Sequence, residues 1–254
     1  MLFGLVEGRG FTVTSLQDLD VLLGAVRAAG FGGVTLRPEL LCGRPSAAAK
    51  LVEAHELVCT DLEALSITRD DEATMAAVER LRPSVEALNP VGVQALVRTR
   101  ISEESLDRLG RASDRLGVPL LIEFGTAPVP TAAAASEVVA ALGTSRARVL
   151  ADAFHFFRVG STIDMLETIP LDHLALVQFD DALPVISDDY MAETINRRTW
   201  PGEGEFDLHA FAGALRRRGW DGVVTVEVFS EEHRKLPVDA FARRAYATAL
   251  PYWQ

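Results

Sequence analysis

Two kinds of apolar pattern alternate along the chain. Short apolar runs predict strands, and the segments between them repeat apolar residues at the three- and four-residue spacing of a helix. In the segment 15–29, Leu16, Leu19, Leu22, Leu23 and Val26 share one helical face. The runs predict strands at 2–7, 33–37, 58–66, 92–98, 174–180 and 222–228, and two further strands that end at Glu123 and Asp152. Helices are predicted at 15–29, 47–56, 71–88, 102–116, 131–142, 162–168, 207–218 and 237–250, with Pro83 interrupting or kinking the third.

The regular alternation of strands and helices predicts an α/β fold, a closed (β/α)8 TIM barrel formed as a single domain by residues 1–254. An open, doubly wound sheet is the alternative, and it is expected to carry a glycine-rich phosphate loop after its first strand. The segment GLVEGRGF matches such a loop poorly, so the closed barrel is favoured.

Four predicted strands end in side chains that offer oxygen ligands: Glu123, Asp152, Gln178 and Glu227. Strand parity points all four into the barrel at its C-terminal mouth, where barrel enzymes place their chemistry. One such acid is ordinarily a rim residue or an ion-pair partner, but four in consistent parity favour a metal site. Three carboxylates brought together repel one another, and a divalent cation resolves this; oxygen ligands suit Mg²⁺ or Mn²⁺ better than zinc.

Charge and cysteine content narrow the class of protein. The net charge of −11 and the lack of a dense basic run argue against partners such as nucleic acid or an anionic membrane. Cys42 and Cys59 give neither metal-ligand spacing nor a disulfide framework. No apolar stretch approaches the ~20 residues of a membrane span, and the first residues lack a signal-peptide core. We therefore expect a cytoplasmic protein that acts on a small molecule.

Arginines gather at the predicted C-terminal strand tips. A single rim arginine is ordinarily solvated, but several on an acidic protein suggest that the substrate carries a carboxylate or a phosphate. These arginines are Arg9, Arg37, Arg98, Arg100, Arg158 and Arg198. The long polar segment 181–205 is a candidate lid over the site, in which Trp200 would exclude water.

The chain resembles the xylose-isomerase-like barrels grouped as sugar phosphate isomerases and epimerases. The resemblance covers most of the chain, is strongest over 119–230, and is specific for the superfamily rather than for a substrate. It is carried by Glu123 in LLIEFG, the run Asp152-Ala153-Phe154-His155 with Arg158, Gln178 in VQFDDA, Arg198, Pro201, Gly202, Gly204, and Glu227 in VTVEVFS.

This resemblance implies a bound Mn²⁺, Mg²⁺ or Co²⁺ ion, with Glu123, Asp152, Gln178 and Glu227 as its ligands. Gln178 departs from the histidine that is usual in the epimerases, and relatives that dehydrate dehydroshikimate-type substrates match it better. An amide oxygen suits a hard cation, so this departure bears on the reaction and not on the metal. Family members often dimerise or tetramerise, which makes a homo-oligomer a further expectation.

The leading hypothesis is a metal-dependent isomerase or epimerase that acts on a ketose, polyol or sugar acid through an enediolate. Glu123 and Glu227 are the predicted acid and base, one removing a C–H proton and the other returning it. His155 is predicted to donate to the developing oxyanion. The other candidates for substrate binding are Arg37, Arg98, Arg158 and Arg198.

Three other functions compete with this one. A dehydratase of a 3-dehydroshikimate- or inosose-like cyclic hydroxy-ketone comes second, favoured by Gln178 and the arginines. The abasic-site endonucleases share this barrel, but they hold three zinc ions with many histidines and need a basic groove, which five histidines and a charge of −11 do not provide. A non-catalytic binding barrel is the third class.

Overall fold

The structure, a computed structural model, describes residues 1–6 and 10–254. Eight strands close into a parallel barrel. They are β1 (Leu2–Val6), β2 (Gly33–Leu36), β3 (Val58–Ile67), β4 (Gly92–Val97), β5 (Leu120–Glu123), β6 (Ala147–Asp152), β7 (Leu174–Phe179) and β10 (Val223–Val226). Their order around the barrel is β1-β10-β7-β6-β5-β4-β3-β2, and β1 closes the ring by pairing with both β10 and β2. The predicted (β/α)8 barrel is confirmed.

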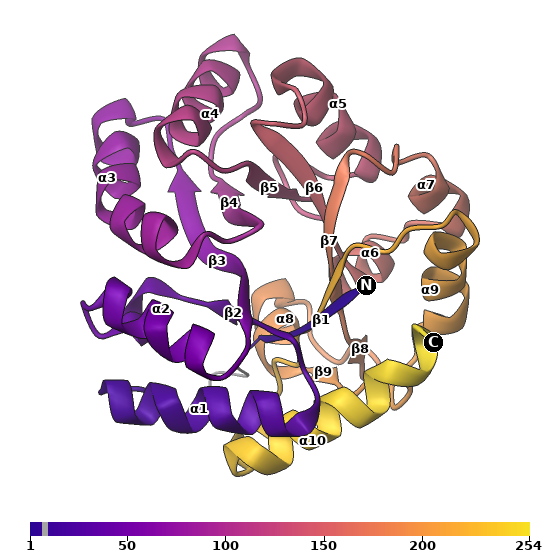
Figure 1. The fold of residues 1–254 in the computed structure, drawn as a ribbon. Helices are drawn as coiled ribbons and strands as arrows, with labels where there is room; N and C mark the ends of the chain where they lie inside the picture. Colours follow the sequence, from indigo (N-terminus) through magenta and orange to yellow (C-terminus); the bar gives the residue numbers. More distant parts are fainter. Residues whose placement is uncertain (7–9) are drawn as a thin grey trace.

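Helices connect successive strands and surround the barrel (Figure 1). They are α1 (Leu16–Ala29), α2 (Pro45–Ala54), α3 (Asp71–Leu88), α4 (Glu103–Leu116), α5 (Ala132–Leu142), α6 (Ala153–Arg158), α7 (Ile163–Glu167), α9 (Leu208–Arg217) and α10 (Val238–Ala249). Single 3₁₀ turns add η1 (Pro38–Leu41), η2 (His233–Lys235) and η3 (Leu250–Tyr252). The short helix α6, directly after β6, has no counterpart in the predicted pattern. In the described part of the chain, no helix is long and apolar enough to cross a membrane.

Helix α1 shows how local sequence sets the helix ends. Ser15 and Asp18 form a capping box, each side chain accepting a hydrogen bond from the other residue's backbone N–H. Gly30 ends the helix with a φ of 111°, a left-handed conformation that glycine adopts without strain. The apolar face between these caps is buried against the barrel, as the periodicity predicts.

Helix α3 differs from the expectation, because it runs without interruption through Pro83. Proline removes one helical hydrogen bond and ordinarily breaks or kinks a helix. Here Val78, Leu81 and Val85 are buried on the face of α3 that packs against β3 and α4. This tertiary packing outweighs the local cost of the proline.

The interior of the barrel has an apolar floor beneath a polar mouth. Leu121, Leu150, Leu176 and Val223 are buried together in a cluster of their own, separate from the larger core between strands and helices. Each has the same strand parity as the oxygen-bearing residue further along its strand, so the floor lies directly below the predicted site. The floor therefore supports the site from beneath.

The polar segment 181–205, the candidate lid, contains three short elements. They are β8 (Asp181–Ala182), α8 (Tyr190–Asn196) and β9 (Arg198–Thr199), and β8 pairs with β9 in an antiparallel sheet. Asp181 anchors the end of the segment, since its carboxylate accepts backbone hydrogen bonds from Gly202, Gly204 and Phe206. Gly204 is required here, because a Cβ at this position would lie 2.2 Å from Asp181 Oδ1.

Replacing Leu176 by alanine should lower the free energy of unfolding by about 2–5 kcal/mol, because the side chain is fully buried in the barrel floor and leaves a cavity. Urea unfolding followed by circular dichroism measures the change. Ile186→Ala is the control, since Ile186 is 74% exposed and its loss should cost less than about 0.5 kcal/mol. Equal effects of the two substitutions would contradict the closed apolar floor.

Candidate metal centre and active site

Adjacent strands bring the four predicted metal ligands to one end of the barrel. Glu123 and Asp152 are the last residues of β5 and β6, and Gln178 is the last but one of β7. Asp152 and Gln178 are direct partners in the pairing of β6 with β7. Glu227 follows β10, which neighbours β7. The side chains meet at the C-terminal mouth; that they bind a metal stays a prediction.

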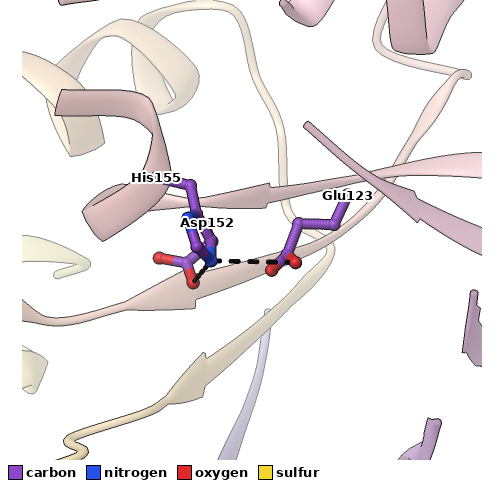
Figure 2. A group of neighbouring side chains, drawn as sticks. All are labelled: Glu123, Asp152 and His155. Carbon is purple, nitrogen blue, oxygen red and sulfur yellow. Dashed lines mark ion pairs between the residues drawn. The ribbon is translucent and has the colours of Figure 1, made fainter. Parts of the chain in front are cut away.

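Glu123, Asp152 and His155 form the closest group of possible ligands (Figure 2). One ligand atom of each lies within 4.8 Å of the other two. His155 Nε2 is 3.7 Å from Glu123 Oε2 and 3.6 Å from Asp152 Oδ2. The local fold explains this closeness: Asp152 caps α6 by accepting a hydrogen bond from Phe154 N–H at 2.7 Å, and the first helical turn carries His155 back toward the strand end.

Gln178 and Glu227 are joined across the mouth by a buried hydrogen bond. Gln178 Nε2 donates to Glu227 Oε1 at 2.8 Å, which leaves Gln178 Oε1 buried without a hydrogen-bond partner among the described residues. A buried amide oxygen without a donor is costly, and a hard cation is a suitable partner for it. The donor set thus fits a divalent cation: one amide oxygen beside the carboxylates of Glu123, Asp152 and Glu227.

Arg198 lies inside the cluster of acids. Its buried Nη1 donates to Asp152 Oδ2 at 2.8 Å and to Asp180 Oδ2 at 2.5 Å, and it lies 2.8 Å from Glu227 Oε2. Its Nε donates to the carbonyl of Thr194, which fixes the guanidinium plane. Arg198 also lines the cavity described below, so a contact with the substrate stays a prediction for this residue. Its ion pairs within the protein are with the carboxylates of the site.

Burial shifts the acid–base behaviour of the site strongly. Burial and, to a smaller extent, the neighbouring charge of Asp152 together raise the pKa of Glu123 to about 8. Burial also raises the pKa values of Glu227 and Asp180, against the lowering effect of Arg198. Burial lowers the pKa of His155 to about 4, so this imidazole is neutral at physiological pH.

A cavity of about 290 Å³ opens at the same mouth. Its walls carry both catalytic candidates, Glu123 and Glu227, together with His155 and Arg198. Its lining also includes Glu63, a buried acid of β3. Further lining comes from α8 and from β4, including Tyr190, Thr194, Gln94 and Arg98. The cavity is large enough for a small polyhydroxylated molecule and borders the acids directly.

The predicted substrate-binding arginines lie in different places. Arg98 is exposed and lines the cavity. Arg158 is not among the lining residues: it is paired with Glu205 at 2.5 Å, and its guanidinium lies 4.9 Å from the ring centre of Phe206. The structure thus assigns Arg158 a contact between α6 and the end of the 181–205 segment, and a role in substrate binding is not supported by its position.

Arg37 follows β2 and is likewise absent from the cavity lining. Arg9, and the end of the first predicted strand at Glu7, lie outside the described residues. Trp200, expected to shield the site from water, is buried elsewhere: its ring stacks on His233 at 4.6 Å and meets Phe241 edge-on at 5.0 Å. The residues of the segment that do border the cavity come from α8 and, with Arg198, from β9.

Sequence reasoning missed three residues of the site. Asp180 lies two positions after Gln178 and shares its parity, so the rule that found Gln178 also indicates Asp180. Glu63 has the inward parity of β3, a strand whose end was not considered. Tyr190 lies on α8 in a segment for which no periodic pattern predicts structure.

A closed parallel barrel with an acid-lined, metal-compatible mouth defines a class of small-molecule enzyme barrels. Residues 23–247 match the family model described as xylose isomerase-like TIM barrel, and the chain belongs to that family. The family assignment made from the motifs around Glu123, Asp152, Gln178 and Glu227 is confirmed.

Several characterised proteins resemble the chain. Inosose isomerase from Bacillus velezensis is 27% identical over 221 residues, which cover 79% of this chain and 77% of that protein. A 3-dehydroshikimate dehydratase from Pseudomonas putida is 29% identical over 89 residues, 35% of this chain and 14% of that protein. The crystal structure of IolI protein with a bound zinc atom has a TM-score of 0.83 and 24% identity, covering 100% of this chain and 98% of that one.

These relatives confirm the prediction of an enzyme of the isomerase or epimerase type. The zinc atom in the IolI structure and the Glu123–Asp152–His155 group together suggest a divalent metal. Its identity as Mn²⁺ or Mg²⁺ stays a prediction.

The metal-free protein should lose stability as the pH rises from 6.5 to 8. At the lower end of this window folded Glu123 keeps most of its proton, whereas the unfolded chain has already released it near the ordinary glutamate pKa, so a higher pH favours unfolding. The contribution of Glu123 to the slope should approach about 1.4 kcal/mol per pH unit at the lower end and fall to about half of that at pH 8. Urea unfolding of chelator-treated protein across this range measures it. Glu123→Gln removes the titrating group, so an unchanged slope in that variant would contradict the assignment.

Proposed function

We propose that the chain is a divalent-metal-dependent isomerase or epimerase of a small polyhydroxy ketone, a cyclic inosose or a ketose. One observation supports this most: Glu123 and Glu227 line the same cavity from strands that are separated by β6 and β7. Two carboxylates that reach one substrate from different directions are what a transfer of a proton between two carbons, or between two faces of one carbon, requires. The match to inosose isomerase supports the substrate class.

Glu123, Asp152, Gln178 and Glu227 are the residues that would hold the cation. A bound divalent cation supplies Lewis-acid stabilisation of negative charge that develops on substrate oxygens. Arg198 keeps Asp152 and Glu227 in place through hydrogen bonds and ion pairs at 2.8 Å. These residues thereby define where the carbonyl and the neighbouring hydroxyl of the substrate lie.

The proton transfers fall to the two glutamates. One carboxylate removes the proton from the carbon next to the carbonyl to give an enediolate, and the other glutamate donates a proton to carbon, which gives the isomeric or epimeric ketone. Burial and Asp152 raise the pKa of Glu123 in the metal-free protein, and a bound cation would favour the ionised carboxylate that acts as a base. His155, neutral and buried at the cavity wall, donates a hydrogen bond to the oxygen on which charge develops.

A dehydratase of a cyclic hydroxy-ketone is the second candidate. Gln178 favours it, since an amide replaces the histidine that is usual in epimerases, and the match to 3-dehydroshikimate dehydratase points the same way. The chemistry begins identically, with proton removal next to a carbonyl, and diverges when the enolate expels a β-hydroxyl that leaves as water after protonation. Exposed Arg98 at the cavity edge offers a partner for a substrate carboxylate.

Glu227→Gln should reduce kcat at saturating metal by about 10²–10⁴-fold, because the variant keeps an oxygen near the cation but cannot transfer a proton. Turnover of inosose and of ketoses, followed by chromatography, measures the loss. Glu86→Gln, on the outer face of α3, is the control and should leave turnover unchanged. Unchanged activity of Glu227→Gln would contradict the assignment of Glu227 as a proton-transfer residue.

Reaction in D₂O separates the two candidate functions. An isomerase or epimerase should incorporate deuterium at carbon into a product of otherwise equal composition, because a returned proton comes from an exchanging carboxyl group. A dehydratase should give a product lighter by one water, with new absorbance of a conjugated enone. Mass spectrometry of the metal-loaded reaction decides between them, and the absence of both changes with every candidate ketone would contradict the proposal.

A further inference from the structure

Tyr190 joins α8 to the ring of His155. Its hydroxyl lies 2.6 Å from His155 Nδ1, a short hydrogen bond that is largely shielded from solvent. Tyr190 is the first residue of α8, and it lines the cavity beside His155. Neither ring nitrogen of His155 is therefore free: Nδ1 faces the phenol, and Nε2 faces the carboxylates.

The surroundings of Nε2 decide which nitrogen carries hydrogen. Nε2 lies 3.7 Å from Glu123 Oε2 and 3.6 Å from Asp152 Oδ2 (Figure 2). A lone pair on Nε2 would face the Asp152 carboxylate and be repelled, whereas an N–H there is attracted to it. In a neutral ring, hydrogen on Nε2 leaves Nδ1 as the acceptor, which matches a donating Tyr190 hydroxyl.

The ring is also held in place by its packing. The Phe154 ring meets it edge-on, with centroids 5.5 Å apart, and the Tyr190 ring lies 5.9 Å away at a tilt of 32°. Gly125 lies so close that a Cβ there would be 2.6 Å from His155 Cβ. Packing thus limits where the ring can move, and the Tyr190 hydrogen bond selects which nitrogen points toward the acids.

We propose that Tyr190 is a positioning residue that holds His155 with its Nε2–H directed at Glu123 and Asp152, so that His155 is a hydrogen-bond donor to the substrate and not a metal ligand. Metal ligation by Nε2 would need a lone pair on that atom, and this arrangement places a hydrogen there. Burial raises the pKa of Tyr190, which keeps its hydroxyl protonated and able to donate. The catalytic part of this inference rests on the proposed function; the hydrogen position does not.

Nitrogen NMR of histidine-labelled protein tests the hydrogen position directly. In the wild type at pH 7.5, with and without Mg²⁺, His155 should show a protonated Nε2 and an unprotonated Nδ1; His155→Gln assigns the signals among the five histidines. Tyr190→Phe should move both shifts toward a tautomer mixture. A wild-type Nδ1–H, or tautomer shifts unchanged in Tyr190→Phe, would overturn the proposal.

Calorimetric titration of metal-free protein with Mn²⁺ tests whether His155 is a ligand. His155→Phe should bind Mn²⁺ within about threefold of the wild type, whereas Glu227→Gln should bind at least tenfold more weakly. Equal losses in the two variants would place His155 among the ligands and overturn the proposal.

Kinetics tests the positioning role. Tyr190→Phe should lower kcat about 10- to 100-fold with KM changed less than threefold, because the phenol acts through His155 on the developing charge. Tyr246→Phe is the matched control: Tyr246 packs against Phe3 and Phe31, away from the cavity, and should behave as wild type. A kcat of Tyr190→Phe equal to the control would overturn the positioning role.

If no ketone is turned over by any form, the proposed function fails, and the NMR and calorimetric results still decide the place of the hydrogen.

Discussion

One electrostatic constraint governs this structure: several carboxylates are buried side by side at one barrel mouth, with the Arg198 guanidinium between them. Burial disfavours each carboxylate's charged form, and the Arg198 ion pairs with Asp152, Asp180 and Glu227 offset this only in part. The acids that destabilise the metal-free mouth are also the oxygen ligands that the proposed divalent cation requires, and the buried Gln178 Oε1 is a neutral oxygen beside them.

The barrel tolerates this concentration of charge because its interior changes gradually from apolar to polar. The leucine-rich floor excludes water from below. Above it, Asp61 accepts hydrogen bonds from the hydroxyls of Thr35 and Thr60 at 2.7 and 2.8 Å. Burial and the neighbouring Glu63 raise the pKa of Asp61 to about 7. Asp61 therefore keeps its proton to a higher pH than an ordinary aspartate, which reduces the charge that is buried in the barrel.

Much of this arrangement is predictable because a closed parallel barrel obeys two simple rules. Side chains alternate along each strand, and all strand ends of one kind meet at one rim, so parity and strand order bring Asp152 and Gln178 side by side. The same parity, counted two positions beyond Gln178, reaches Asp180. It does not reach Glu63, which lies in the middle of β3, or the connection after β7, whose path depends on contacts between distant residues rather than on periodicity. In α3 the local signal of Pro83 is outweighed by packing, which keeps the helix continuous.

The connection after β7 has no periodic pattern from which its structure could be predicted, yet it contributes two residues to the site. It supplies Arg198, which neutralises the acids, and Tyr190, which orients His155. Its far end is fixed to the barrel by Asp181, whose carboxylate holds the backbone of Gly202 and Gly204. Because one anchored segment carries both residues, any displacement of it would remove the counter-charge and release the histidine together. The path of this segment and the arrangement of the acids and His155 at the mouth are thus linked.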